Sequence, residues 1–129
     1  MTSLEQLFQI GFVNDTVDIL GVQFGLTVLD TKRLTDALNA AVESDSQAQL
    51  LSYKAEILAR AITSINGKSN FEDNNNPTKD EIQKVLNTVI AKLHYTVVNA
   101  LYEKYDALDK GVAKEVEDDV KKSSSNRGA

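Results

Sequence analysis

The sequence predicts a mainly α protein, a small helical bundle with one N-terminal β-hairpin. Apolar residues recur at helical spacing along most of the 129 residues, whereas the alternation typical of strands is convincing only over residues 16–28. The hydrophobic fraction of 42% and the charged fraction of 26% are those of an ordinary globular domain. We therefore expect one helical domain over residues 1–122 and a flexible, serine-rich tail over residues 123–129.

Charge and residue content narrow the classes of function. The net charge of −5 and the lack of a Lys and Arg cluster disfavour binding to nucleic acid or to an anionic membrane surface. No apolar run approaches the roughly 18 residues of a membrane helix, and residues 1–5 show no basic secretory leader. The absence of cysteine excludes disulfides and thiol chemistry. We expect a protein that folds in a cytoplasm and binds neither nucleic acid nor membrane.

The N-terminal region is predicted to hold a short helix and then the hairpin. Residues 1–10 can form an amphipathic helix that Ser3 caps and Gly11 ends. The hairpin over residues 16–28 consists of two alternating runs on either side of Gly21. In the second run one face is apolar, with Val22, Phe24, Leu26 and Val28. Because a lone hairpin is marginal in water, it must pack on the helices or pair with another chain.

Two helices are predicted to follow the hairpin. Asp30 or Thr31 can cap the first of them. Its apolar positions fall on one face, with Leu34, Ala37, Leu38, Ala41 and Val42. The second helix follows an apolar stripe from Leu50 to Ile65, and Asn66 and Gly67 tolerate the left-handed backbone that commonly ends a helix.

A further helix is predicted after the polar loop over residues 71–77. Thr78 and Glu81 form a capping box at its start. Its apolar positions repeat at spacings of three and one, with Ile82, Val85, Leu86, Val89, Ile90 and Leu93. Two alternatives stay open at His94–Thr96: Thr96 can cap a new helix, or one helix can run through.

The last predicted helix, residues 96–122, has the features of a docking helix. Its apolar seam is narrow and its flanks carry mixed charges, as in a coiled coil. Gly111 costs about 1 kcal/mol of helix stability relative to alanine, so the helix can bend there. Two tyrosines in the seam fit either core packing, the simpler interpretation, or anchoring of a partner. The candidate partner-binding residues are Leu101, Tyr102, Tyr105, Leu108, Val112 and Val116.

The residues that could carry chemistry form no recognisable site. His94 is the single histidine, and a histidine at a helix junction is better interpreted as structural than as a general base. The acidic group at residues 115–119 alternates with lysines, as a solvated helix face does. Gly67-Lys68-Ser69 is a fragment of a phosphate loop whose upstream glycine is missing at Ile62. The sequence thus predicts no catalytic residue, no metal site and no cofactor.

Two stretches carry a resemblance to a known class of proteins. The stretches Leu58–Lys68 and Val97–Tyr105, in the order hairpin, paired helices, loop and helix, resemble the short tail proteins of bacteriophages. The resemblance implies a non-enzymatic protein made in the host cytoplasm and acting by protein contacts. One kind is a small structural subunit of the tail tip or baseplate hub, located in the virion tail and assembled with tube, hub or tape-measure subunits. The other kind is a tail assembly chaperone that binds the tape-measure protein.

A third possibility belongs to a different class. His94 beside Tyr95, together with the acidic group near Glu117, leaves open a small ligand-binding domain or enzyme. Of these alternatives, a structural tail subunit is the interpretation that we favour.

Overall fold

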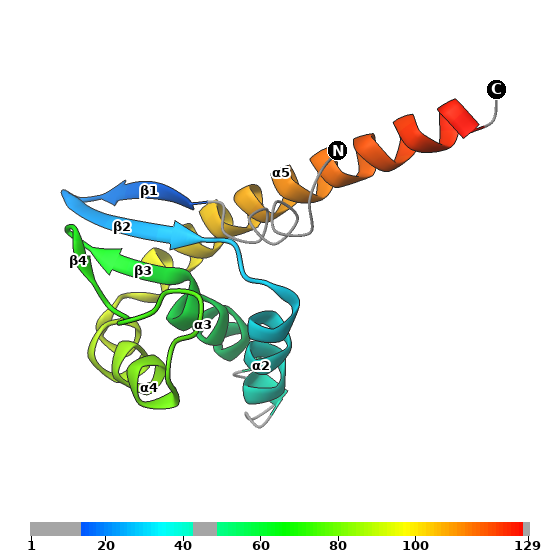
Figure 1. Cartoon of the computed structure of the whole chain (residues 1–129). Coiled ribbons are helices and arrows are strands. Elements are labelled where there is room, and N and C mark those ends of the chain that lie inside the picture. Colours follow the sequence, from blue (N-terminus) through cyan, green and yellow to red (C-terminus); the bar gives the residue numbers. More distant parts are fainter. Residues whose placement is uncertain (1–13, 43–48, 128–129) are drawn as a thin grey trace.

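The computed structural model describes residues 14–42 and 49–127, and these residues combine helices with one antiparallel sheet. The sheet has four strands in the order β1-β2-β3-β4. The elements are β1 (Asn14–Ile19), β2 (Val22–Thr27), α2 (Thr31–Val42), α3 (Gln49–Ala61), β3 (Ile62–Ile65), β4 (Lys68–Ser69), α4 (Lys79–Thr88), the short 3-10 helix η1 (Ile90–Lys92) and α5 (Tyr95–Arg127). Figure 1 shows α2, α3 and α4 on one side of the sheet, while α5 passes the sheet and extends away from it. The prediction of a mainly α protein is confirmed, but the sheet is larger than one hairpin.

The predicted N-terminal hairpin is present as β1 and β2. Val17 faces Phe24 across the antiparallel pair. Leu20 and Gly21 form the turn with φ of 50° and 85°, the positive values that a two-residue turn of type I′ requires. Phe24 and Leu26 are buried in the core, so the apolar face of the hairpin packs on the helices, the first of the two alternatives.

The prediction of helix up to Ile65 was wrong, because the chain changes from α3 to β3 at Ile62. Asn66 and Gly67, with φ of 52° and 80°, form the turn of a second hairpin and do not end a helix. Asn66 also accepts a hydrogen bond from the Gln23 amide through Oδ1 at 2.9 Å. The physical reason is that the free edge of β2 offers backbone partners to a β-branched segment, and this pairing outweighs the helical spacing of its isoleucines.

Caps fix the starts of two helices. The Asp30 carboxylate accepts a hydrogen bond from the Arg33 amide at 2.9 Å, so Asp30 rather than Thr31 caps α2. The capping box of α4 is confirmed, since Thr78 accepts from the Glu81 amide and Glu81 accepts from the Thr78 amide. Glu81 also accepts from the Glu72 amide at 2.8 Å, and these backbone hydrogen bonds lower the pKa of Glu81. The same side chain therefore ties the preceding loop to the start of α4.

The break at His94 separates η1 from α5. The His94 ring nitrogen Nδ1 accepts a hydrogen bond from the Thr96 amide at 3.3 Å and lies 2.8 Å from the Thr96 hydroxyl. Neither alternative from the sequence holds, because the helices are separate and His94, rather than Thr96, caps the last one. The helix runs without interruption through Gly111 to Arg127, beyond the predicted boundary at Lys122.

Two predictions fall wholly or partly outside the described residues. The short helix predicted over residues 1–10 lies outside the described residues. Residues 128 and 129 of the predicted tail also lie outside them, whereas residues 123–127 belong to α5.

The core lies where α3, α5 and the sheet meet. Its fully buried large side chains come from four elements, with Leu26, Ile57, Leu58, Ile62 and Leu101. Removing each from water contributes about 2 kcal/mol to folding. In contrast, Leu38 and Val42 on α2 and Leu50 on α3 are exposed, although the sequence stripes predicted them to be buried.

Alanine substitutions at two glycines, one in the second hairpin turn and one in α5, should change stability in opposite directions. Gly67→Ala should lower the free energy of unfolding by about 1 kcal/mol, because alanine is strained at a φ of 80°. Gly111→Ala should raise it by up to about 1 kcal/mol, because alanine favours helix and the added methyl group has open space around it. Urea unfolding of both variants measures the difference. Equal effects on stability would contradict the second hairpin.

Candidate protein-binding surface

The apolar face of α5 is buried in its first half and exposed in its second. Val98, Leu101 and Tyr105 are buried in the core, and Leu108 packs against it. The same face continues outward at Val112, Val116 and Val120, which we name the outer seam. Val112 is half-buried, whereas Val116 and Val120 are 43% and 58% exposed. The face thus continues past the point where the rest of the described chain covers it.

The part of α5 that carries the outer seam projects from the body. Every residue from 113 to 122 is exposed, and Figure 1 shows the orange-to-red half of α5 clear of the other elements. We name residues 112–127 the projecting segment. At about 1.5 Å per residue it is roughly 24 Å long. No other element of the described chain packs along most of this length.

Polar and aromatic contacts on α3 hold the inner half of α5 in place. The Tyr53 and Tyr102 rings meet edge to face with centroids 5.9 Å apart. Lys54 donates a hydrogen bond to the Asn99 side chain at 3.0 Å and lies 5.5 Å from the centre of the Tyr102 ring. These contacts add to the burial of Leu101 and fix the direction in which the projecting segment points.

The structure separates the six candidate partner-binding residues into three groups. Leu101 and Tyr105 are 0% and 4% exposed, so their side chains build the core and are covered in this conformation. Tyr102 and Leu108 are half-buried against the core, which leaves only part of each side chain open. The two outer residues, Val112 and Val116, belong to the outer seam.

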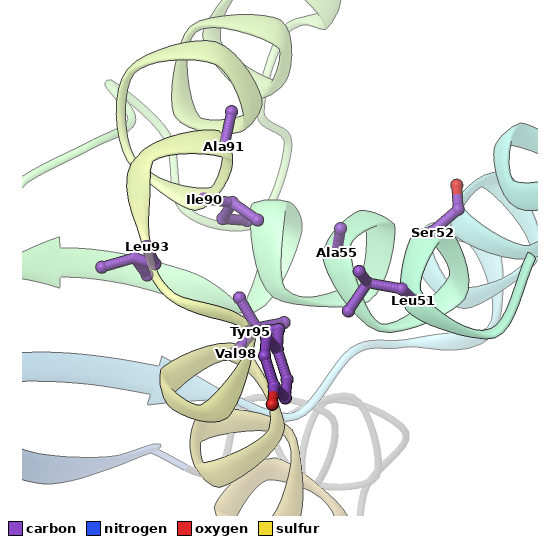
Figure 2. Close-up of a pocket in the computed structure, with 8 residues that line it drawn as sticks. All are labelled: Leu51, Ser52, Ala55, Ile90, Ala91, Leu93, Tyr95 and Val98. Atoms are coloured by element: carbon purple, nitrogen blue, oxygen red, sulfur yellow. The ribbon is translucent and has the colours of Figure 1, made fainter. Parts of the chain in front are cut away.

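A second apolar feature is a groove between α3 and the start of α5. Its volume is about 420 Å³, and Figure 2 shows Leu51 and Ala55 of α3 facing Tyr95 and Val98 of α5 across it. Tyr95 is 59% exposed and its ring lies 4.4 Å from that of His94. The sequence did not indicate this groove, because the Leu50–Ile65 stripe predicted Leu51 to be buried and nothing paired Leu51 with Tyr95.

The residues considered for chemistry lie apart from one another. His94 is exposed at the start of α5, whereas the acidic group at residues 115–119 lies on the projecting segment of the same helix. Lys68 and Ser69 form the short strand β4 after the hairpin turn, a setting unlike a phosphate loop. Within residues 14–42 and 49–127, no group of three or more His, Cys, Asp or Glu side chains is placed to hold a metal ion. None of the helices described combines the length and apolar character of a membrane span.

Comparisons with known proteins identify no family or relative. No protein-family model, curated protein or solved structure gives a significant match to the chain.

The ionisation of Tyr105 provides a test of its position in the core. Burial, followed by the nearby Asp109 carboxylate, raises the pKa of Tyr105 from 10.0 to about 12. A raised pKa favours the neutral hydroxyl in the folded state, so its stabilising effect is complete below pH 10 and is lost as the pH rises toward 12. Urea unfolding between pH 8 and pH 12 should show a steeper loss of stability in the wild type than in Tyr105→Phe. The same dependence of stability on pH in the two proteins would mean that the Tyr105 ring is exposed to solvent.

Alanine substitutions distinguish the core part of α5 from its exposed part. Tyr105→Ala should lower the free energy of unfolding by roughly 3 to 4 kcal/mol, because it leaves a cavity in the core. Val116→Ala should change it by less than about 0.5 kcal/mol, because the side chain is largely exposed. Thermal and urea unfolding check both values. A large loss of stability in Val116→Ala would show that the outer seam is already covered.

Proposed function

We propose that this protein is a non-enzymatic bacteriophage tail protein, a small structural subunit of the tail tip or baseplate. It acts through protein contacts, and the projecting segment of α5 is its main binding element. The observation that carries the proposal is the outer seam, an apolar face that continues from the core into solvent. The partners are other tail proteins, such as tube, hub or tape-measure subunits, and the location is the virion tail.

The energetics of the projecting segment support a role in binding. Helical segments of about 12 to 15 residues are marginal in water without tertiary packing. Covering one valine side chain contributes about 1.5 kcal/mol, so a partner over Val112, Val116 and Val120 would stabilise the segment substantially. The inner half of α5 is fixed on α3, so the segment presents this face in a defined direction.

The assignment to a phage tail rests on the resemblance of two stretches. The stretch Leu58–Lys68 forms the end of α3, β3 and the second hairpin turn, and Val97–Tyr105 forms the inner half of α5. Both contribute to the same core cluster, through Leu58 and Ile62 in one and Val98 and Leu101 in the other. The resemblance therefore concerns the residues that determine the fold, while the outer seam supplies the contact surface.

A tail assembly chaperone is the alternative that the apolar groove favours. A groove lined by Leu51, Tyr95 and Val98 suits temporary binding of an apolar helix, as a chaperone for the tape-measure protein would require. Mass spectrometry and electron microscopy of purified tail particles distinguish the two roles. A structural subunit remains in the finished particle, whereas absence from the particle rules that role out and favours the chaperone.

Substitutions in the outer seam test the proposed function. The double variant Val116→Asp, Val120→Asp should fold normally and fail to enter tail particles, because it places charge in the contact. Co-expression with the tail genes that we expect beside its own gene, followed by particle purification, measures incorporation. Leu20→Asp is the matched control, since Leu20 is 97% exposed on the first hairpin turn, and it should be incorporated normally. Incorporation of the double variant at the wild-type level would contradict the proposal.

A further inference from the structure

Most acidic side chains of α5 near Val112, Val116 and Val120 lie on the same side as the outer seam. Asp109 is three residues before Val112 and seven before Val116, and Asp119 is three residues after Val116 and seven after Val112. Glu115 is three residues after Val112, and Glu117 is three residues before Val120. Separations of three and seven residues put side chains on one face of an α-helix. The outer seam is therefore flanked by carboxylates.

Most lysines of this region lie on the opposite face of α5. Lys110 and Lys114 are each two residues from Val112, and Lys121 is five residues from Val116, separations that turn them away from the seam. Lys110 is also paired with the Asp106 carboxylate at 2.8 Å. Lys122, three residues after Asp119 at the end of the seam, is the one lysine of this region on the seam side. The seam side thus carries a net negative charge while the lysines gather behind it.

No ion pair among the described residues involves a seam-side carboxylate. Among the described residues, the ion pairs join Lys32 to Asp36, Arg33 to Asp30, Arg60 to Glu56 and Lys110 to Asp106. None of these pairs involves Asp109, Glu115, Glu117 or Asp119. Asp109 is half-buried, and burial followed by the neighbouring Asp106 raises its pKa, which shows that its charge is unfavourable where it stands.

We propose that the outer seam binds an amphipathic helix whose apolar stripe is flanked by lysine or arginine. This inference rests on the proposed function and names the chemistry of the partner. Valines would cover the apolar stripe, and Asp109, Glu115, Glu117 and Asp119 would meet the basic flanks, as charged flanking positions do in coiled coils. A second copy of the chain fits less well, because two seams aligned in parallel place the same carboxylates opposite each other.

The test uses the full-length protein and two designed helical peptides. Both peptides carry the same leucine stripe, and one has lysine flanks while the other has glutamate flanks. Fluorescence anisotropy measures the affinity of each peptide for the wild type. The lysine-flanked peptide should bind about tenfold more tightly, since a few exposed ion pairs together contribute an effect of that size. Equal affinity for the two peptides would overturn the inference.

A matched pair of charge variants shows whether any preference belongs to the seam. Neutralising the seam side with Asp109→Asn, Glu115→Gln, Glu117→Gln and Asp119→Asn should abolish the preference. Neutralising the same number of exposed acidic groups away from the seam, with Asp18→Asn, Glu72→Gln, Glu103→Gln and Asp118→Asn, should retain it. An equal loss in both variants would mean attraction by net charge alone and would overturn the inference. Circular dichroism checks that both variants keep the fold.

Two further outcomes separate the inference from the proposed function. Sedimentation that shows a dimer, lost in Val116→Asp, Val120→Asp, would make a second copy the partner and overturn the inference. If neither peptide binds but that double variant still fails to enter tail particles, the inference fails and the proposed function stands. If neither peptide binds and the double variant is incorporated normally, both fail.

Discussion

The packing of the inner half of α5 on α3 is the interaction on which the rest of the structure depends. Leu101 is fully buried among side chains of α3 and the sheet, and Tyr105 fills the neighbouring position in the core. The Leu29 backbone, in the segment between β2 and α2, interacts with the Tyr105 side chain and lowers its pKa slightly against the effect of burial. Because these contacts fix one half of a 33-residue helix, they also set the direction of the other half, which has little tertiary support of its own.

The sheet complements this packing by covering another side of the core. β2 is central because it pairs with β1 along one edge and with β3 along the other. Gly25 of β2 lies against Ser64 of β3, where a larger residue would crowd the Ser64 side chain. Both hairpins use two-residue turns with positive φ. The sheet therefore needs few residues for its turns.

The sequence predicted those features that depend on local rules and missed those that depend on tertiary partners. The first hairpin and the Thr78–Glu81 capping box involve neighbouring residues, and both were recognised. The strand Ile62–Ile65 was missed because its isoleucines fit a helical stripe equally well, and only the free edge of β2 decides between the two. In α5 a single apolar seam runs from Leu101 to Val116, so spacing alone could not show where the core ends and the exposed surface begins. The exposed groove between Leu51 and Tyr95 was missed because its two sides come from distant parts of the chain.

The outer seam is exposed among the described residues, and the proposed function requires it to be covered in an assembly. Amide hydrogen exchange over the projecting segment, residues 112–127, measures this most directly. We expect fast exchange in the isolated protein and strong protection once the protein is assembled with its partner, while the inner half of α5 is protected in both states. Equal exchange in the two states, whether fast or slow, would contradict this proposal.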